Sequence, residues 1–417
     1  MVVFCAMRTI IVLSVLLLAV SCGFAASGAA PEFAALYEAH HWFALRDALQ
    51  AGDTPVFYRA AVEAVFNQSE AAERDLGAVI AAAPHGRDVY EAHTLLAGMY
   101  LRTGQYREAL AQTEALLVET PDAADVKNIL PLIRVLSGTP DQSVIWEQTS
   151  TVPIQILDGN LLLAVSTNGR AAHYALDTDS AVSLVSESEA NRLGFTVREV
   201  ATSIDGMSGK GMKPRVAVAN TLTVGNVRLA NVAFYVLPDT QPPFDGMPEG
   251  TRGILGIPVI LALQTVRWRA KAQTLECAVP LKRTDIRQAN LAFDGGSPVV
   301  QVNFQQEALE FSFDTGAQRT DLYPAFAKKF ADLVKATGKK ESHTLTGIDG
   351  SASFDSVVLP SVTLQAGGRD VVLKPAHVLL VEHNSASQWY FGNLGVDLLN
   401  QASSVTMDFH PMTLTLQ

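Results

Sequence analysis

The sequence predicts a multidomain protein in which an all-α N-terminal region precedes two all-β lobes of common plan. Residues 31–138 are rich in Ala, Leu and Glu and show no strand-like alternation. Beyond residue 139, short runs of Val, Leu, Ile, Thr and Phe are separated by Gly, Asn, Asp and Pro, as in strands and turns. The order of motifs in residues 139–285 recurs in residues 286–417. A chain of 417 residues is also too long for one hydrophobic core, so several domains are expected.

The composition is that of a folded chain with an acidic balance. Hydrophobic residues make up 48% and charged residues 18%, and the formal net charge is −11 with an isoelectric point near 5.3. Nucleic-acid binding depends on a basic excess that neutralises phosphates, and this chain has none. We therefore expect no nucleic-acid partner.

Residues 1–30 have the layout of a secretory signal. Arg8 precedes the apolar run Ile10–Val20, and small residues follow up to Ala30. The run is too short for a bilayer span, although a retained membrane anchor is the alternative. The protein is expected to be exported, and to be periplasmic, secreted or attached to a membrane through its signal or a lipid.

Two cleavage sites compete at the end of this segment. Ala19-Val20-Ser21-Cys22 resembles a bacterial lipobox, in which Cys22 is lipidated, although Leu is usual where Ala19 stands. The alternative is an ordinary small-x-small site within residues 24–30.

Beyond the signal segment the chain contains one cysteine, Cys277, so no intramolecular disulfide is possible in the mature body. We expect Cys277 to be a buried strand residue.

Residues 92–121 contain two aromatic residues, a turn glycine, a small packing residue and a closing proline, namely Tyr100, Tyr106, Gly104, Ala109 and Pro121. This pattern resembles a tetratricopeptide repeat. Ala72 and Pro84 precede Ala109 and Pro121 at equal spacing, which suggests an earlier copy. A generic helical bundle is the alternative. Stacked repeats bind peptides or other domains, so a protein partner is expected here.

Turn formers at residues 137–141 mark the boundary with the strand-rich part. In each half a predicted hairpin, residues 160–176 or 298–313, leads directly to an aspartate, and a short helix follows. The aspartates are Asp177 and Asp314.

Four landmarks recur in the same order in both halves. They are Asp-Thr at 177 and 314, Ser183 or Thr320 at the same distance beyond, Ile-Asp-Gly at 204 and 348, and Gly-Ile-Leu-Gly at 253 or Gly-Asn-Leu-Gly at 392. This agreement indicates duplicated lobes. A pseudo-twofold axis between such lobes would place Asp177 and Asp314 opposite each other.

Two adjacent carboxyl groups suit hydrolysis of an amide bond. Like charges at contact distance cannot both ionise easily, so the pair retains one proton and offers both a general acid and a general base. The hydroxyls of Thr178 and Thr315 are expected to bond across the lobe junction, and Gly316 allows close backbone approach.

The Asp-Thr-Gly-Ala turn at 314–317, the Ser or Thr that follows and the later Gly-Ile-Leu-Gly resemble the retropepsin-like aspartic peptidases. The resemblance covers residues 150–417 as two lobes in one chain. It implies an aspartic endopeptidase with an all-β double-lobed fold and with Asp177 and Asp314 as the catalytic pair. It also implies a bound extended peptide or unfolded protein and neither metal nor organic cofactor.

The resemblance further implies flaps that close over the substrate at 204–211 and 347–353. Their candidate residues are Ile204, Asp205, Gly206, Gly209, Gly347, Asp349 and Gly350. Ser208-Gly-Lys-Gly211 has some likeness to a phosphate loop, but the preceding glycine spacing is wrong and no long helix follows.

Asp179 is the main departure from the family pattern, because it occupies the position of Gly316 in the other lobe. If its side chain faces the cleft, it raises the pKa values of the pair; if it points away, it caps a turn. The rival hypothesis is therefore a catalytically impaired, peptide-binding protein whose helical domain docks a partner. A third possibility makes the helical domain an inhibitory pro-segment.

Overall fold

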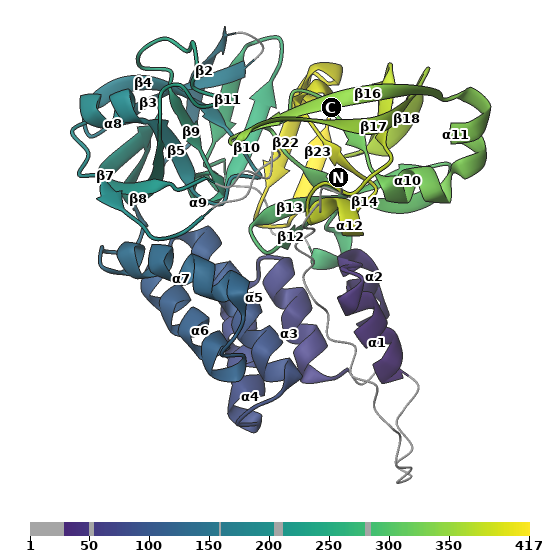
Figure 1. The fold of residues 1–417 in the computed structure, drawn as a ribbon, viewed down its shortest axis with the longest axis horizontal. Coiled ribbons are helices and arrows are strands. Elements are labelled where there is room, and N and C mark those ends of the chain that lie inside the picture. The colour runs from purple at the N-terminus through teal and green to yellow at the C-terminus, as the bar shows by residue number, and fades with distance from the viewer. Residues whose placement is uncertain (1–28, 50–53, 158–159, 204–211, 280–284) are drawn as a thin grey trace, which may run out of the picture.

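The computed structural model describes residues 29–49, 54–157, 160–203, 212–279 and 285–417. A group of helices lies beneath two β-rich lobes (Figure 1). This arrangement confirms the predicted fold class, an all-α N-terminal region followed by an all-β double-lobed region. None of the described helices is both long and apolar enough to cross a membrane. Cys22 and nearly all of the predicted signal segment lie outside the described residues.

The helices of the N-terminal region pack in sequence order, each against the next. They are α1 (Ala29–Glu38), α2 (Trp42–Ala48), α3 (Val56–Val65), α4 (Ser69–Ala82), α5 (Arg87–Thr103), α6 (Tyr106–Glu119) and α7 (Ala124–Ser137). Gly104 ends α5 in the left-handed conformation, with φ +73°, and its N–H bonds to the Leu101 carbonyl at 3.1 Å. The predicted turn is thus present. Ala72 and Ala109 are fully buried, which lets neighbouring helices approach closely.

Lobe 1, residues 139–285, contains mostly short strands. They are β1 (Ser143–Trp146), β2 (Ser150–Leu157), β3 (Asn160–Thr167), β4 (Arg170–Leu176), β5 (Ser183–Ser186), β6 (Arg198–Glu199), β7 (Arg215–Val224), β8 (Val227–Leu237), β9 (Gly253–Leu255), β10 (Thr265–Arg269) and β11 (Thr274–Cys277), with helices α8 (Glu187–Arg192) and α9 (Ile257–Ala262). Asn168 and Gly169 have φ values of +48° and +78°, as the tight turn of the β3–β4 hairpin requires. Cys277 is buried in β11, as predicted.

Lobe 2, residues 286–417, has a longer set of elements. They are η2 (Ile286–Gln288), β12 (Leu291–Asp294), β13 (Ser297–Phe304), β14 (Glu307–Phe313), β15 (Asp321–Leu322), α10 (Pro324–Lys329), α11 (Ala331–Thr337), β16 (Lys339–Gly347), β17 (Gly350–Leu359), β18 (Val362–Ala366), β19 (Arg369–Leu373), β20 (Ala376–Leu379), α12 (Ala386–Trp389), β21 (Gly392–Leu394), η3 (Val396–Gln401), β22 (Ser404–Asp408) and β23 (Thr413–Leu416).

The strand pairings of the two lobes correspond closely. In lobe 1, β4 is parallel to β9, and β5 is antiparallel to β9 and parallel to β8. In lobe 2, β14 is parallel to β21, and β15 is antiparallel to β21 and parallel to β20. The β3–β4 and β13–β14 hairpins also match. Each aspartate therefore follows a strand that is paired from within its own lobe.

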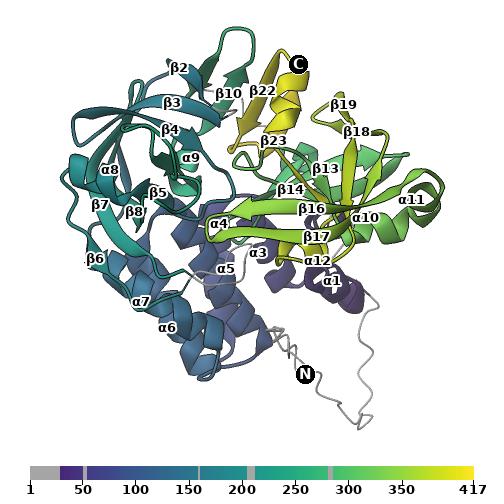
Figure 2. The same ribbon diagram turned by 45° about the horizontal axis from the view of Figure 1, so that its top comes forward.

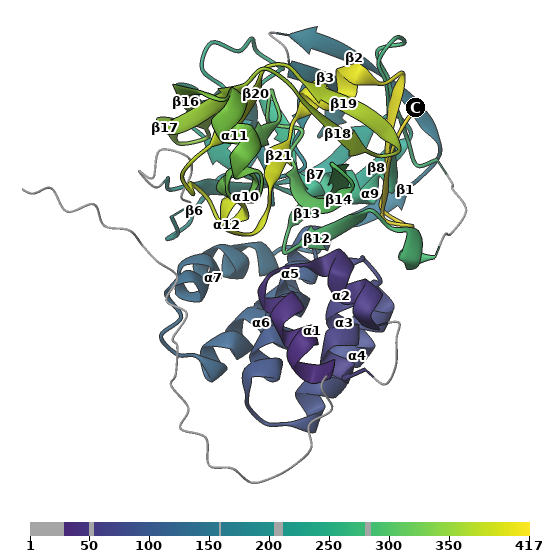
Figure 3. The same ribbon diagram turned by 90° about the vertical axis from the view of Figure 1, so that its right-hand side faces the viewer.

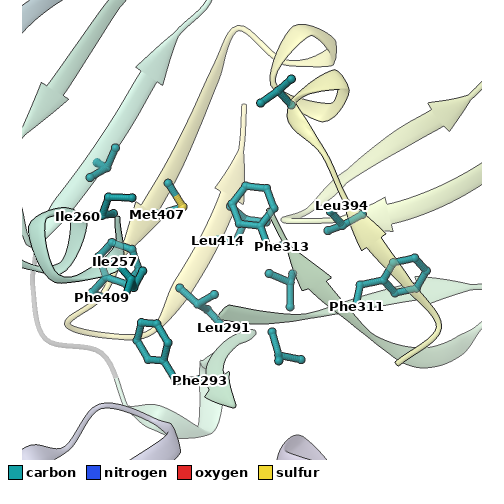
Figure 4. Close-up of a cluster of buried hydrophobic side chains, with 14 of the residues drawn as sticks. Ile257, Ile260, Leu291, Phe293, Phe311, Phe313, Leu394, Met407, Phe409 and Leu414 are labelled. Atoms are coloured by element: carbon teal, nitrogen blue, oxygen red, sulfur yellow. The ribbon is translucent and has the colours of Figure 1, made fainter. Parts of the chain in front are cut away.

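A shared antiparallel sheet joins the lobes. Its strand order is β23-β22-β10-β11-β2, so the hairpin that closes lobe 1 pairs with the penultimate strand of lobe 2. One hydrophobic core continues through both lobes and into the first helices. Figure 4 shows part of it, where side chains from α9 and from strands of lobe 2 gather in one cluster.

The helical layer is packed against both lobes (Figure 3). On the lobe 2 side, the buried Arg102 guanidinium donates to the carbonyl of Gly295 at 3.3 Å and lies 4.9 Å from the centre of the Phe293 ring. Trp42 Nε1 donates to the Tyr390 hydroxyl at 3.3 Å. On the lobe 1 side, a buried cluster contains Tyr106, Leu132, Leu136, Val200, Val216 and Ala233. The helices therefore make buried contacts with both lobes.

Candidate active site

Asp177 and Asp314 occupy equivalent positions at the ends of β4 and β14. The Asp177 N–H donates to the Leu255 carbonyl at 3.0 Å, and the Asp314 N–H donates to the Leu394 carbonyl at 2.9 Å. These bonds extend the parallel pairings β4–β9 and β14–β21 by one residue. The same local structure therefore delivers one carboxyl group from each lobe.

Thr178 and Thr315 join the two turns through reciprocal hydrogen bonds. The Thr178 hydroxyl donates to the Phe313 carbonyl at 2.7 Å and accepts from the Thr315 N–H at 3.0 Å. The Thr315 hydroxyl donates to the Leu176 carbonyl at 2.8 Å and accepts from the Thr178 N–H at 3.1 Å. The two aspartates are thereby held close enough for the charge of Asp314 to act on Asp177.

Gly316 is required by the close approach of the two turns. A Cβ atom at this position would lie 2.8 Å from both Cγ and Oδ2 of Asp177, closer than packed side chains come. The N–H groups of Gly316 and Ala317 donate to Asp314 Oδ1 at 2.7 and 3.1 Å. Gly316 therefore both makes room for one carboxyl group and binds the other.

Asp179 keeps the backbone role of Gly316 but adds a carboxylate to the site. Its N–H donates to Asp177 Oδ1 at 3.0 Å, as the Gly316 N–H does to Asp314. Its own Oδ1 accepts a hydrogen bond of 2.5 Å from the Ser297 hydroxyl of lobe 2. The side chain lines the cleft, so the first of the two orientations considered from the sequence is the one found.

The three carboxyl groups line one cavity, where the surrounding protein and their mutual closeness favour the protonated forms, although Asp179 keeps access to solvent. Burial, then the charges of Asp314 and Asp179, raise the pKa of Asp177 well above its ordinary value. Burial also raises the pKa of Asp314, but the N–H groups of Gly316 and Ala317 and the Asn393 amide oppose this. Desolvation by the cleft walls, then the Asp314 charge, raises the pKa of Asp179 to about 7. The three donors to Asp314 favour its ionised form over that of Asp177.

Asn393 is a site residue that the sequence reasoning missed. Its Nδ2 donates to Asp314 Oδ2 at 3.4 Å, and its Oδ1 accepts from the Ser312 hydroxyl at 2.8 Å. Ser312 pairs with Asn393 between β14 and β21, whereas lobe 1 pairs Ala175 with Ile254. The available signal was the polar Asn in Gly-Asn-Leu-Gly, where the other lobe has Ile.

Ser183 and Thr320 make equivalent hydrogen bonds in the two lobes. Their hydroxyls accept hydrogen bonds of 3.0 Å from the N–H groups of Gly256 and Gly395, respectively. The lobes differ beyond this point, because Thr320 also donates to Asp397 at 2.7 Å, where lobe 1 has Pro258. The recurrence of a hydroxyl residue in both halves thus has a structural role in each.

The cleft between the lobes encloses a cavity of about 1010 Å³. Asp177, Asp179 and Asp314 line it, together with mostly apolar side chains of both lobes and of the shared sheet. This size and apolar lining with a few polar groups are typical of substrate sites.

The β16–β17 hairpin of lobe 2 extends toward lobe 1 (Figure 2), and Thr346, Gly347 and Ile348 at its tip line the cavity. Gly347 and Gly350 flank its turn, and Ile348 packs against an apolar cluster of lobe 1 that includes Met212 and Phe244. Gln241 Nε2 donates to the Ile348 carbonyl at 2.6 Å. The second predicted flap thus lies over the cavity, with Asp349 in its turn. The residues predicted for the first flap, Ile204, Asp205, Gly206 and Gly209, lie outside the described residues.

No group of three or more His, Cys, Asp or Glu side chains in the described part of the chain is arranged to hold a metal ion. Among the histidines of lobe 2, His383 lines the cavity that contains the three aspartates. His343 Nε2 is 3.2 Å from Asp321 Oδ1 and its ring stacks on His377.

Comparison with known proteins finds a family match within lobe 1. Residues 163–259 match the family model described as aspartyl protease.

Two solved structures resemble part of the chain. One is a retropepsin-like aspartic protease from Rickettsia conorii, with 14% identity and a TM-score of 0.22 over 33% of this chain and 95% of that one. The other is the EIAV protease in complex with the inhibitor HBY-793, with 23% identity and a TM-score of 0.19 over 25% of this chain and 86% of that one. No curated protein matches the chain. The match over residues 163–259 supports a protease-type function.

Proposed function

We propose that the chain is an exported aspartic endopeptidase that hydrolyses peptide bonds with a water activated by Asp177 and Asp314. The observation that carries the proposal is the reciprocal bonding of Thr178 and Thr315, because it brings two carboxyl groups together where they retain a proton. The match of residues 163–259 to the aspartyl protease family model supports it from sequence.

The two carboxyl groups take different roles in the first step. Asp314 is the ionised member, because backbone N–H groups and Asn393 stabilise its charge. It takes a proton from the water as the water oxygen attacks the peptide carbonyl carbon. Protonated Asp177 gives its proton to the carbonyl oxygen, so the intermediate is a neutral diol.

Breakdown of the diol restores the pair. Asp314 returns its proton to the departing amine nitrogen, the carbon–nitrogen bond breaks, and one diol hydroxyl returns its proton to Asp177. The products are an amine and a carboxylic acid, and no other reactant is consumed. The substrate is an extended peptide or unfolded protein that lies in the cleft beneath the β16–β17 hairpin.

The rival function is peptide binding without catalysis, and Asp179 is the observation in its favour. A third carboxylate raises the pKa of Asp177 further and occupies a position where the other lobe has glycine. The enzyme hypothesis instead treats Asp179 as a group that sets the pH range of activity. The Asp179 carboxylate is bound by the Ser297 hydroxyl.

The deciding experiment measures cleavage of an unfolded protein at mildly acidic pH. The wild-type chain should cleave, and Asp314→Asn should abolish cleavage, as should a statine-containing peptide. Cleavage that continues in Asp314→Asn overturns the mechanism. The rival instead expects no cleavage by the wild type and clear activity in Asp179→Gly.

Export through residues 1–30 is part of the proposal, with Cys22 as the lipidation candidate. Its test is N-terminal sequencing of the mature chain combined with fatty-acid labelling of wild type and Cys22→Ser. Labelling that Cys22→Ser removes would establish a lipid anchor, whereas cleavage within residues 24–30 would establish an ordinary signal. The tetratricopeptide-like repeat and its protein partner stay predictions.

A further inference from the structure

Helix α7 of the N-terminal region forms part of the wall of the active-site cleft. Asp125, Asn128, Ile129 and Leu132 all line the cavity that contains the three aspartates. Their spacing places them on one face of the helix. Leu130 and Ile133 are buried beside this face, and α7 packs against α6 of its own domain.

This helix is fixed to lobe 1 next to the cavity by Asn128. Its Nδ2 donates to the Ser203 carbonyl at 2.7 Å, and its Oδ1 accepts from the Ser203 N–H at 3.0 Å. The Thr202 hydroxyl donates to the Asn128 carbonyl at 2.6 Å. An amide that pairs with both backbone groups of one residue fixes the distance and the rotation of the helix against the lobe.

The cleft-facing side of α7 is apolar at its centre. Ile129 retains 36% exposure although it is a large aliphatic residue, and it lines the cavity. Leu132 of α7 and Tyr235 of β8 belong to one apolar cluster and line the same cavity. A large apolar group in this position would remove the exposed aliphatic surface from water.

We propose that Ile129 and Leu132, with Tyr235, form a subsite that binds a large apolar side chain of the peptide substrate. This inference rests on the proposed function, since the occupant is the peptide whose backbone passes the aspartates in the same cavity. The helical region is therefore a substrate-binding part of the mature enzyme and not a removable pro-segment.

The helical region is also attached to lobe 2, which agrees with a permanent role for this region in the mature enzyme. Arg102 of α5 donates to the carbonyl of Gly295, in the turn that precedes Ser297, and Ser297 binds Asp179. Removing the helices would expose the buried surfaces of both lobes and release this turn.

The first experiment maps cleavage preference with a peptide library that varies one position at a time. Ile129→Ser should lose preference for large apolar residues at a single position, by about tenfold in kcat/KM, whereas Ile129→Val should keep it. Val118→Ser is the matched control, because Val118 of α6 is an exposed aliphatic residue that does not line the cavity. A preference profile of Ile129→Ser that superimposes on wild type overturns the subsite.

The second experiment does not depend on turnover. Ile129→Cys and Val118→Cys are prepared in the full chain with Asp314→Asn, and alkylation of each new thiol is followed by peptide mapping. A statine-containing peptide with leucine side chains should slow alkylation at 129 and not at 118. Equal rates at 129 with and without bound peptide reject the subsite and leave the proposed function standing. Failure of the wild type to cleave or bind any peptide rejects both.

Discussion

Thr178 and Thr315 exchange hydrogen bonds across the junction of the two lobes, each hydroxyl donating to the carbonyl that precedes the other turn's aspartate. Neither lobe forms the site alone, because each aspartate turn is completed by a residue of the other lobe. Thr178 is fully buried, so its hydroxyl has no water to replace a lost partner.

Thr178→Val should therefore weaken both stability and activity. The change leaves the Phe313 carbonyl and the Thr315 N–H without their partner, at a cost of about 1–3 kcal/mol for each buried group left unsatisfied. Denaturant unfolding should show the lower stability, and peptide hydrolysis should fall by at least about 100-fold because the carboxyl groups lose their alignment. Thr178→Ser keeps the hydroxyl and serves as the control. A Thr178→Val variant with wild-type activity would show that the bonds do not position the pair.

Asn393→Leu should move the acidic limb of the pH profile toward neutral pH. The amide stabilises ionised Asp314, so its loss raises the pKa of that carboxyl group. Activity requires Asp314 to be ionised, and it should therefore begin at a higher pH, by about one unit for one hydrogen bond to a charged group. The measurement is kcat/KM against pH. Ile254→Leu, at the equivalent position of lobe 1, should leave the acidic limb in place.

Much of this site could be predicted because its parts are local in sequence. A hairpin, an Asp-Thr turn and a later glycine motif recur at matched spacing, and each is formed by neighbouring residues. The position of Asn393 beside Asp314 could not be predicted, because it depends on a parallel pairing between distant strands. The pairing of β10 with β22 and the contact of α7 with the cleft were also missed, since surfaces that meet only after folding have no local pattern.

Asp179→Asn should narrow the pH range of activity on its basic side. The Asp179 charge raises the pKa of Asp177, and activity requires Asp177 to be protonated. Without that charge Asp177 loses its proton at a lower pH, so activity should decline earlier as the pH rises. Because the pKa of Asp179 is about 7, wild type and variant should coincide well below pH 7 and separate above it. Asn retains an oxygen that can accept the Ser297 hydrogen bond, so a difference reports charge. Superimposable profiles above pH 7 would show that Asp179 has no electrical influence on the pair.

The same carboxyl groups should make the fold less stable as the pH rises. Each has a pKa that is raised in the folded chain, so the folded state binds protons more tightly than the unfolded state does. Their contribution to stability is therefore fully present below the ordinary carboxyl pKa and is lost as the pH rises through the raised pKa values, of which that of Asp179 is about 7. The melting temperature of wild type should fall over that interval by more than that of Asp179→Asn. Parallel falls in the two proteins would assign the effect to other groups.

Alanine at the two equivalent turn positions, 179 and 316, should have different effects on hydrolysis. At Gly316 a Cβ would lie 2.8 Å from Cγ and Oδ2 of Asp177, so Gly316→Ala must displace a catalytic carboxyl group. At position 179 the turn already accommodates a Cβ, and Asp179→Ala only removes the carboxylate. We expect hydrolysis to fall by about 100-fold or more in Gly316→Ala, since small displacements of reacting groups are this costly, and to persist in Asp179→Ala. Because both variants carry a methyl side chain at equivalent turns, the comparison separates crowding of the pair from loss of the third charge. Equal losses in both variants would mean that the carboxylate of Asp179 takes part in hydrolysis.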